Sequence, residues 1–388
     1  MDFELMALRS HRLSHPVEYN LEEFNLREDN TTYYNFTSSK VKQKLNFSQI
    51  ITNDVINDVI QVKKKVKVQI SHIGFLKVHK AGSSTMQNMF FRYGLRNNLT
   101  FVLPKTGHYV LSHNQALPVT NGSHRDILAC HSMYRQSIFS KLLPADSVKI
   151  GIVREPLDRM ISAAFYYRDV LRKRYLRKVP KKDFIENLIN KSSIYDSDTF
   201  SRTKNSMGRD FGFSSHIKFE DTGLIKSQLA KLEKEFSLVL MVERFDESLV
   251  LMKRLLNWEL SDIIYLKTNT HPHTHEKLNQ GTVAKFKKIN FLDQAVYDTF
   301  KDVFKSKVKD AGPSLQREVT VYRNILKMVK TFCDTASNKD RLLVPDSKWN
   351  DVFYVTYTAC KLMSSDELPF VSALRSRHKA MHSVKQKA

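Results

Sequence analysis

From about residue 70 onward, short apolar runs bounded by polar turns alternate with longer stretches in which apolar residues recur at helical spacing. The runs predicted to form buried strands are Ile73–Val78, Ile127–Cys130, Val148–Val153, Leu238–Val242 and Ile263–Leu266. Helical spacing occurs at Met86, Met89, Phe90 and Tyr93, and again at Leu249, Met252, Leu255 and Leu256. Strands that alternate with helices predict an α/β fold with a mostly parallel sheet and helices on both faces.

The first part of the chain has a different character. Residues 1–65 are polar and rich in Asn and Thr, with no sustained period of 2 or 3.6, so we interpret them as a stem or linker. Residues 66–388 are expected to form the folded domain. No transmembrane helix is expected, because no stretch approaches about 18 uninterrupted apolar residues.

Six Asn-x-Ser/Thr sequons favour a lumenal protein whose membrane anchor is missing from this chain. They lie at Asn30, Asn35, Asn46, Asn98, Asn121 and Asn190. The chain has three cysteines and no CxxC spacing, so no structural zinc site is expected. At most one internal disulfide can form; the expected pair is Cys333–Cys360, which leaves Cys130 over.

Positive charge dominates the chain beyond its first 60 residues. Lys and Arg number 62 against 40 Asp and Glu, a formal net charge of +22. Such a basic body predicts an anionic partner: a nucleotide, a nucleic acid, an acidic glycan or an anionic membrane surface. A soluble basic protein without such a partner is the alternative.

The segment GFLKVHKAGSSTMQNMFFRYG predicts a strand that runs into a phosphate-binding turn. The strand ends at Val78, and a helix is expected to open at about Ser84, where free N–H groups and the helix dipole form an anion site. Gly82 lets the backbone approach a ligand, and Lys80 places a mobile cation there. The hydroxyl donors of this turn are Ser83, Ser84 and Thr85.

This turn does not match the Walker A motif GxxxxGK[ST], because its lysine precedes the glycine and no second glycine is present. An ATPase or kinase is therefore the weaker interpretation. A serine-capped helix beside a surface lysine is the alternative that needs no ligand.

A second candidate element follows the predicted strand that ends at Val153. Arg154 comes next, at the carboxyl edge where ligands bind in open α/β sheets. Pro156 is suited to the first position of a helix, and Ser162 lies about two turns into it. A guanidinium fork and a hydroxyl can hold a phosphate from two sides.

The two segments FLKVHKAGSST and IVREPLDRMISAAFYY resemble the nucleotide-binding elements of sulfotransferases that use 3′-phosphoadenosine 5′-phosphosulfate. More narrowly, the chain resembles the galactose 3-O-sulfotransferase (galactosylceramide sulfotransferase) family. Further matching text is ILACHSM, GRDFGF, ERFDESLVLMKRLLNW and CKLMSSDELPF, so the resemblance covers about residues 70–370.

The resemblance implies a P-loop-like sulfotransferase fold, with residues 66–388 as the catalytic domain. The expected reaction is sulfuryl transfer from 3′-phosphoadenosine 5′-phosphosulfate to a galactose hydroxyl, expected to be the 3-OH, of a glycolipid such as galactosylceramide or of a glycoprotein glycan. It also implies a type II membrane protein on the lumenal side of the Golgi. The alternatives are sulfation of another glycan, such as a glycosaminoglycan, and a noncatalytic basic module that binds acidic glycans or RNA. The preferred interpretation involves no nucleic acid and no metal, and it leaves the oligomeric state open.

The resemblance also assigns roles to residues. Those expected to hold the 5′-phosphosulfate are Lys77, Lys80, Ala81, Gly82, Ser83, Ser84 and Thr85. Arg154 and Ser162 would hold the 3′-phosphate. Val78, Ala81 and Gly82 depart from the family's usual Thr, Thr and Ala, and Ala163–Ala164 replace bulkier or polar residues, which bears on acceptor preference more than on cofactor binding.

Sulfuryl transfer needs an in-line hydroxyl, a base and a cation for the leaving phosphate. Lys80 is the expected cation. His131 is the expected base because it follows a predicted strand and matches the family's histidine there. His79 is the runner-up, as base or as sulfate contact. An unperturbed imidazole predicts a pH–rate limb near ~6–7, and Glu243 is a further candidate for acceptor binding or for the base.

Two other charged or histidine-rich segments are conspicuous. The basic run Arg168–Lys182 is interpreted as a solvated helix face, with steering of an anionic acceptor or contact with lipid headgroups as the alternative. The cluster THPHTHEK contains His271, His273 and His275. We interpret it as a loop near the cofactor and not as a metal site.

Overall fold

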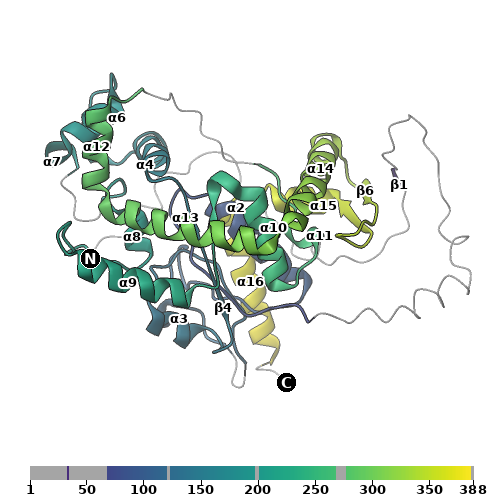
Figure 1. Cartoon of the computed structure of the whole chain (residues 1–388). Coiled ribbons are helices and arrows are strands. Elements are labelled where there is room, and N and C mark those ends of the chain that lie inside the picture. The colour runs from purple at the N-terminus through teal and green to yellow at the C-terminus, as the bar shows by residue number, and fades with distance from the viewer. Residues whose placement is uncertain (1–32, 35–67, 120–122, 197–200, 268–276, 386–388) are drawn as a thin grey trace, which may run out of the picture.

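The centre of the molecule is a four-stranded, wholly parallel sheet (Figure 1). A computed structural model describes residues 33–34, 68–119, 123–196, 201–267 and 277–385. The strands are β2 (Ile73–Phe75), β3 (Ile127–Leu128), β4 (Val148–Val153) and β5 (Leu238–Met241), in the spatial order β3-β2-β4-β5. The register pairs Ile73 with both Ile127 and Val148, and Ile150 with Leu238. The α/β fold with a parallel sheet is therefore confirmed.

Four of the five predicted strands are present, three of them shorter than predicted. The fifth prediction, Ile263–Leu266, is wrong. Ile263 ends the short helix α11 (Leu260–Ile263), whose start is fixed by a capping box between Glu259 and Asp262. Ile263 and Ile264 are buried, so the apolar run signalled burial correctly, but Ile263 closes a capped helical turn and the next three residues form neither helix nor strand.

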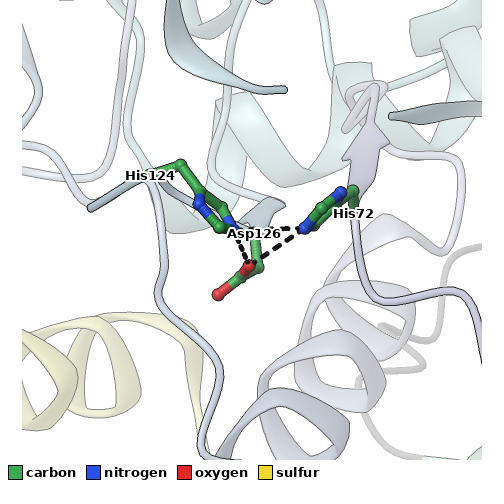
Figure 2. A group of neighbouring side chains, drawn as sticks. All are labelled: His72, His124 and Asp126. Atoms are coloured by element: carbon green, nitrogen blue, oxygen red, sulfur yellow. Dashed lines mark hydrogen bonds and ion pairs between the residues drawn. The ribbon is translucent and has the colours of Figure 1, made fainter. Parts of the chain in front are cut away.

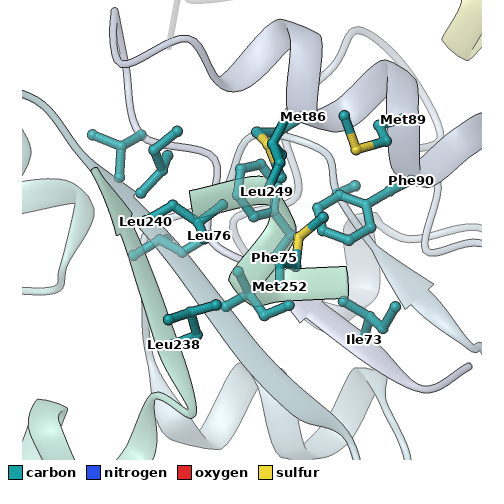
Figure 3. Packing of buried hydrophobic residues seen from close by; sticks show 14 of the residues in the cluster. Ile73, Phe75, Leu76, Met86, Met89, Phe90, Leu238, Leu240, Leu249 and Met252 are labelled. Atoms are coloured by element: carbon teal, nitrogen blue, oxygen red, sulfur yellow. The ribbon is translucent and has the colours of Figure 1, made fainter. Parts of the chain in front are cut away.

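One face of the sheet packs against α2 (Ser83–Arg96) and α10 (Phe245–Leu256). Figure 3 shows this layer, in which strand residues lie under helical side chains. The strand residues are Ile73, Phe75, Leu238 and Leu240, and the helical ones are Met86, Met89, Phe90, Leu249 and Met252. Apolar side chains at helical spacing thus face the sheet as predicted.

The opposite face packs against α3 (Gln136–Leu142), α9 (Thr222–Glu235) and α13 (Phe291–Ala311). Gly151 of β4 shows how closely this layer approaches, because a Cβ there would lie 3.2 Å from Phe211 and 3.3 Å from Phe236. Phe300 of α13 stacks on Phe211. The prediction of helices on both faces is confirmed.

A second, three-stranded sheet was not predicted. It joins β6 (Arg341–Val344) antiparallel to β7 (Phe353–Thr356) and parallel to β1 (Tyr33–Tyr34). The expected disulfide Cys333–Cys360 links α14 (Pro313–Thr335) to α15 (Tyr357–Met363), and Cys130 is free and buried. β1 belongs to the predicted stem, while the boundary near residue 65 lies outside the described residues.

The remaining elements form the periphery. A separate apolar cluster joins α4 (Pro156–Phe165), the π-helical turn η4 (Tyr166–Val170), α5 (Arg174–Arg177), α6 (Phe184–Asn190) and α12 (Gln280–Ile289). The others are η3 (His113–Gln115), α7 (Ser192–Tyr195), α8 (Ser206–Asp210), η5 (Val242–Arg244) and α16 (Glu367–Lys385). In the described part of the chain, no helix combines the length and the apolar character needed to cross a membrane.

The strand order defines where a ligand can bind. The chain passes from β2 to β3 on one side and then crosses over to β4 on the other, so the direction of winding reverses between β2 and β4. In open α/β sheets a crevice forms at this switch point, outside the carboxyl ends of the strands. The loops after β2 and β4 are the two segments that the sequence singled out.

A buried ion pair anchors the C-terminal helix to this core. Lys77 is fully buried, and its Nζ lies 2.5 Å from Glu367 Oε2 and 2.9 Å from Gln87 Oε1. Glu367 is the first residue of α16, where a carboxylate also interacts favourably with the helix dipole. Removal of either partner would leave the other charge without compensation.

We therefore expect Glu367→Ala to lower the free energy of unfolding by ~3 kcal/mol, because it strands the buried Lys77 ammonium. Urea denaturation would measure this, with the exposed Glu220→Ala as the matched control, expected to change stability by less than ~0.5 kcal/mol. Equal unfolding midpoints for the two variants would contradict the structural role of the pair.

Candidate active site

The loop after β2 brings Lys80 and the start of α2 to the switch point. α2 begins at Ser83, one residue before the predicted start, and Gly82 caps it with a φ of 65°. Lys80 itself has a φ of 60°, a conformation that a non-glycine residue adopts at a cost. This backbone carries the lysine between the strand and the helix N-terminus.

The predicted hydroxyl donors of this loop have different environments. Ser83 is buried and donates its hydroxyl to the Val78 carbonyl, at 2.6 Å, so it braces the loop. Ser84 is exposed at the helix start, and Thr85 is half-buried. Ala81 is fully buried. The roles of these residues as cofactor contacts stay predictions, with Ser84 having the most accessible hydroxyl.

Arg154 reaches the same place from β4. Its Nη1 donates to the Lys80 carbonyl at 3.3 Å, which joins the two loops directly. Pro156 is the first residue of α4, as predicted. Ser162 lies in the second turn of α4 and is partly exposed, whereas its neighbours Ile161 and Ala163 are buried.

The two cations are close to each other; Asp158, Glu243 and Glu155 are near enough to raise the pKa of Arg154 but form no ion pair with it within the described residues. In the described part of the chain neither Lys80 nor Arg154 has a carboxylate oxygen within 4.0 Å. Burial and the charge of Arg154 lower the pKa of Lys80 to about 8, and burial lowers the pKa of Arg154. The Lys80 ammonium lies 3.8 Å from the ring centroid of Tyr166, in the π-helical turn. An anion between the two cations would supply the missing charge.

Two other predicted residues lie near this site but are already engaged. Glu243 accepts a hydrogen bond from the Glu155 backbone N–H at 2.6 Å, so it fixes the turn that follows Arg154. Lys77 is held by Glu367 and Gln87 as described above. Acceptor binding by Glu243 and cofactor binding by Lys77 stay predictions.

His79 and His131 lie together, at the next corner of the site. Their rings stack with centroids 4.3 Å apart, and Tyr109 stacks on His131 at 5.1 Å. His131 follows β3 and forms an isolated parallel bridge with Tyr109. The structure therefore brings the two candidate bases into one stack beside the lysine loop.

Asp210 orients His79. Its carboxylate accepts from the His79 ring Nδ1 at 2.9 Å and from the His79 backbone N–H at 2.8 Å. The Tyr109 hydroxyl lies 2.9 Å from the His79 Nε2, and burial raises the pKa of Tyr109 to about 12, so it remains a donor. Because a carboxylate only accepts, the proton of His79 belongs on Nδ1.

In the described part of the chain, His131, unlike His79, is not oriented by a hydrogen bond at its Nδ1. Its Nδ1 is buried and has no hydrogen-bond partner among the residues that the structure describes. Burial and the nearby Lys77 hold the pKa of His131 well below the usual range, so the ring is neutral at pH 7. The Nδ1 nitrogen is closed to solvent as well as unpaired within the described residues, which is costly.

Sequence reasoning missed several members of this site. Asp210 and Glu367 lie inside the matching segments GRDFGF and SSDELPF, which flagged the segments without giving the residues a role. No sequence motif pointed to Tyr109 or Arg202. The Arg202 Nη1 lies 3.4 Å from the His79 Nε2. All four are positioned by tertiary contacts between distant segments.

The basic run Arg168–Lys182 is largely exposed, as predicted, but it is not one helix face, because only its start in η4 and the four residues of α5 are helical. The exposed basic residues of the run are Arg172, Lys173, Arg174, Arg177, Lys178, Lys181 and Lys182. Arg168 differs, because it pairs with Asp169 and stacks on Phe165 and Phe184. The histidines of the THPHTHEK segment lie outside the described residues.

Comparison with known proteins identifies the family. A sequence profile of the galactose-3-O-sulfotransferase family matches residues 47–351, which include both loops and both stacked histidines. The chain belongs to the galactose-3-O-sulfotransferase family. This family member is 29% identical to galactose-3-O-sulfotransferase 3 of Mus musculus over 276 residues, which are 67% of this chain and 63% of that protein.

Two human relatives show the range within the family. Galactosylceramide sulfotransferase of Homo sapiens is 27% identical over 290 residues, 71% of this chain and 68% of that protein. Galactose-3-O-sulfotransferase 2 of Homo sapiens is 27% identical over 276 residues, 68% of each chain. The names of these galactose-3-O-sulfotransferase family members refer to a glycolipid acceptor in one case and to galactose in general in the other.

We expect 15N NMR of this galactose-3-O-sulfotransferase family member to show His79 as the Nδ1–H tautomer, because Asp210 only accepts and Tyr109 donates to Nε2. Difference spectra against His79→Gln would assign the signal. Asp210→Asn should remove the preference, while the exposed His216 serves as an unchanged reference. An Nε2–H tautomer in the unmodified protein would refute the assignment.

Proposed function

We propose that this chain transfers a sulfuryl group from 3′-phosphoadenosine 5′-phosphosulfate to a hydroxyl of galactose. The observation that carries the proposal is the pair Lys80 and Arg154: two adjacent cations at the switch point of the sheet, neither of which forms an ion pair with a carboxylate among the described residues. A nucleotide with phosphates at both its 3′ and 5′ positions offers two anionic groups for two cations. Family membership supports the choice of donor and acceptor.

In this proposal the fold is P-loop-like in how it holds phosphates, without a Walker A sequence. The free N–H groups at the start of α2, with the exposed Ser84, would bind the 5′-phosphosulfate. Lys80 would neutralise charge that develops on the bridging oxygen as the sulfur–oxygen bond breaks. Arg154 and Ser162 would bind the 3′-phosphate, which the guanidinium fork suits.

The acceptor hydroxyl must lose its proton as its oxygen attacks the sulfur. We propose that His131 takes this proton, because burial keeps its ring neutral and it stacks on His79 in the loop that carries Lys80. The leaving product is then adenosine 3′,5′-bisphosphate. His79 is the second candidate, favoured by its orientation through Asp210.

We further propose a galactose 3-OH as the target, on a glycolipid such as galactosylceramide or on a glycoprotein glycan, and a Golgi lumenal location for the full-length protein. The Cys333–Cys360 disulfide supports an oxidising compartment. Protein expressed in animal cells should therefore lose mass on treatment with an N-glycosidase. Unchanged gel mobility would argue against the lumenal location.

Transfer of labelled sulfate tests the function directly. We expect label on a terminal β-galactoside and none on its 3-O-methyl derivative, because the methyl group blocks the accepting oxygen. Lys80→Ala should abolish transfer, and the exposed Lys178→Ala should leave it unchanged. Label on the 3-O-methyl galactoside would contradict the 3-OH as the accepting group.

Arg154→Ala should weaken binding of adenosine 3′,5′-bisphosphate by ~1.5–3 kcal/mol, the range for a lost charge-assisted hydrogen bond. Normal nucleotide binding by Arg154→Ala would contradict the assignment of the nucleotide site.

The role of His131 as the base can be tested by turnover and by its dependence on pH. His131→Ala should reduce turnover by a factor on the order of 10²–10⁴ with little change in nucleotide affinity. Turnover should rise with pH through the His131 pKa, because only the neutral ring accepts a proton. Burial lowers that pKa, so the rise should lie below the ~6.5 of a free imidazole, lower than the sequence alone predicted.

The variant His79→Ala separates the two histidines. If it loses turnover but not nucleotide affinity while His131→Ala stays active, the two roles must be exchanged. If both variants stay active, the base is not a histidine, and Glu243 is the next candidate.

A further inference from the structure

A second polar cluster lies at the opposite edge of the same sheet. His72 directly precedes β2, His124 and Asp126 precede β3, and Asp146 precedes β4. Because the strands are parallel, their starts meet at one edge, and Lys80 and Arg154 lie at the other. Nothing in the proposed transfer reaction uses this cluster.

Three ligand-type atoms of the cluster form a compact triangle (Figure 2). The His72 Nε2 lies 3.2 Å from the His124 Nε2 and 3.4 Å from the Asp126 Oδ1. The His124 Nε2 lies 3.0 Å from the same Asp126 oxygen. A tetrahedral zinc site, with bonds of about 2.0–2.2 Å, places its ligand atoms about 3.3–3.5 Å apart. The triangle is therefore within a few tenths of an ångström of the spacing that zinc requires.

The remaining polar atoms of these residues are held in place. Asp146 accepts from the His72 Nδ1 at 2.8 Å, which leaves the Nε2 lone pair facing the triangle. Thr100 donates its backbone N–H and its hydroxyl to the Asp126 Oδ2, at 2.6 and 2.7 Å, so Oδ1 faces the histidines. A carboxylate behind a ligating histidine is the outer shell that metal sites commonly have.

We propose that His72, His124 and Asp126 bind a zinc ion, with Asp146 as a positioning residue behind His72. Two imidazoles and one carboxylate suit zinc and related transition metals better than Mg²⁺ or Ca²⁺, which prefer all-oxygen sites. The His124 side chain is 58% exposed, so the ion can enter from solvent and keep a water in the fourth position. The ion would clip together the starts of β2 and β3.

Equilibrium dialysis of untagged, metal-depleted protein against zinc chloride, followed by elemental analysis, tests the proposal. We expect one zinc ion per chain at this site. His124→Ala should weaken its binding by at least 100-fold, because one ligand of three is lost. Asp146→Asn should weaken it by 10–100-fold, the usual effect of an outer-shell carboxylate. Zinc should raise the melting temperature of the unmodified protein and not that of His124→Ala.

Two control variants separate this site from other histidines. His216→Ala removes an exposed histidine that makes no side-chain contact in the described structure, and should bind zinc normally. The triple variant His271→Ala/His273→Ala/His275→Ala removes the histidine-rich segment and should also keep the site. If the unmodified protein binds no zinc, or if binding is lost in the triple variant and kept in His124→Ala, the proposal is wrong. In that case the contacts of the triangle are hydrogen bonds alone.

Discussion

The site depends on two positive charges, Lys80 and Arg154, that the sheet brings together with no ion-pair partner in the described part of the chain. Lys80 and Arg154 come from loops 74 residues apart, and only the reversal of strand order between β2 and β4 makes those loops neighbours. Burial and mutual repulsion make the protonated lysine unfavourable, which lowers its pKa to about 8. Binding of an anion between them would relieve this repulsion, and in the proposed reaction the donor would do so at the atom where charge develops.

Local patterns were sufficient to predict much of this core. The apolar runs predicted four strands, Pro156 predicted the start of α4, and the start of α2 was placed within one residue. The disulfide was also predicted correctly. The strand prediction at Ile263–Leu266 failed because an apolar run reports burial and not backbone conformation: Ile263 ends the capped helix α11, and the following residues are irregular.

What the sequence did not predict depends on contacts between distant segments. Asp210 reaches His79 across 131 residues, and Glu367 reaches Lys77 only because α16 folds back onto the sheet. The cluster of His72, His124 and Asp126 has no motif spacing, since it is formed by strand starts that the topology brings to one edge. The lowered pKa of His131 is likewise a property of its burial among other cations and rings, which no local pattern contains.

Proton uptake on nucleotide binding tests directly whether Lys80 and the nucleotide share one site. Calorimetry at pH 8 in two buffers with different ionisation enthalpies would count the protons taken up as adenosine 3′,5′-bisphosphate binds. With a pKa of about 8, Lys80 is about half protonated at that pH. The account predicts an uptake of about half a proton per nucleotide in the unmodified protein. In Lys80→Arg, whose side chain is always charged, it predicts none. Equal uptake by the two proteins, or none by either, would contradict the claim that Lys80 and the nucleotide share one site.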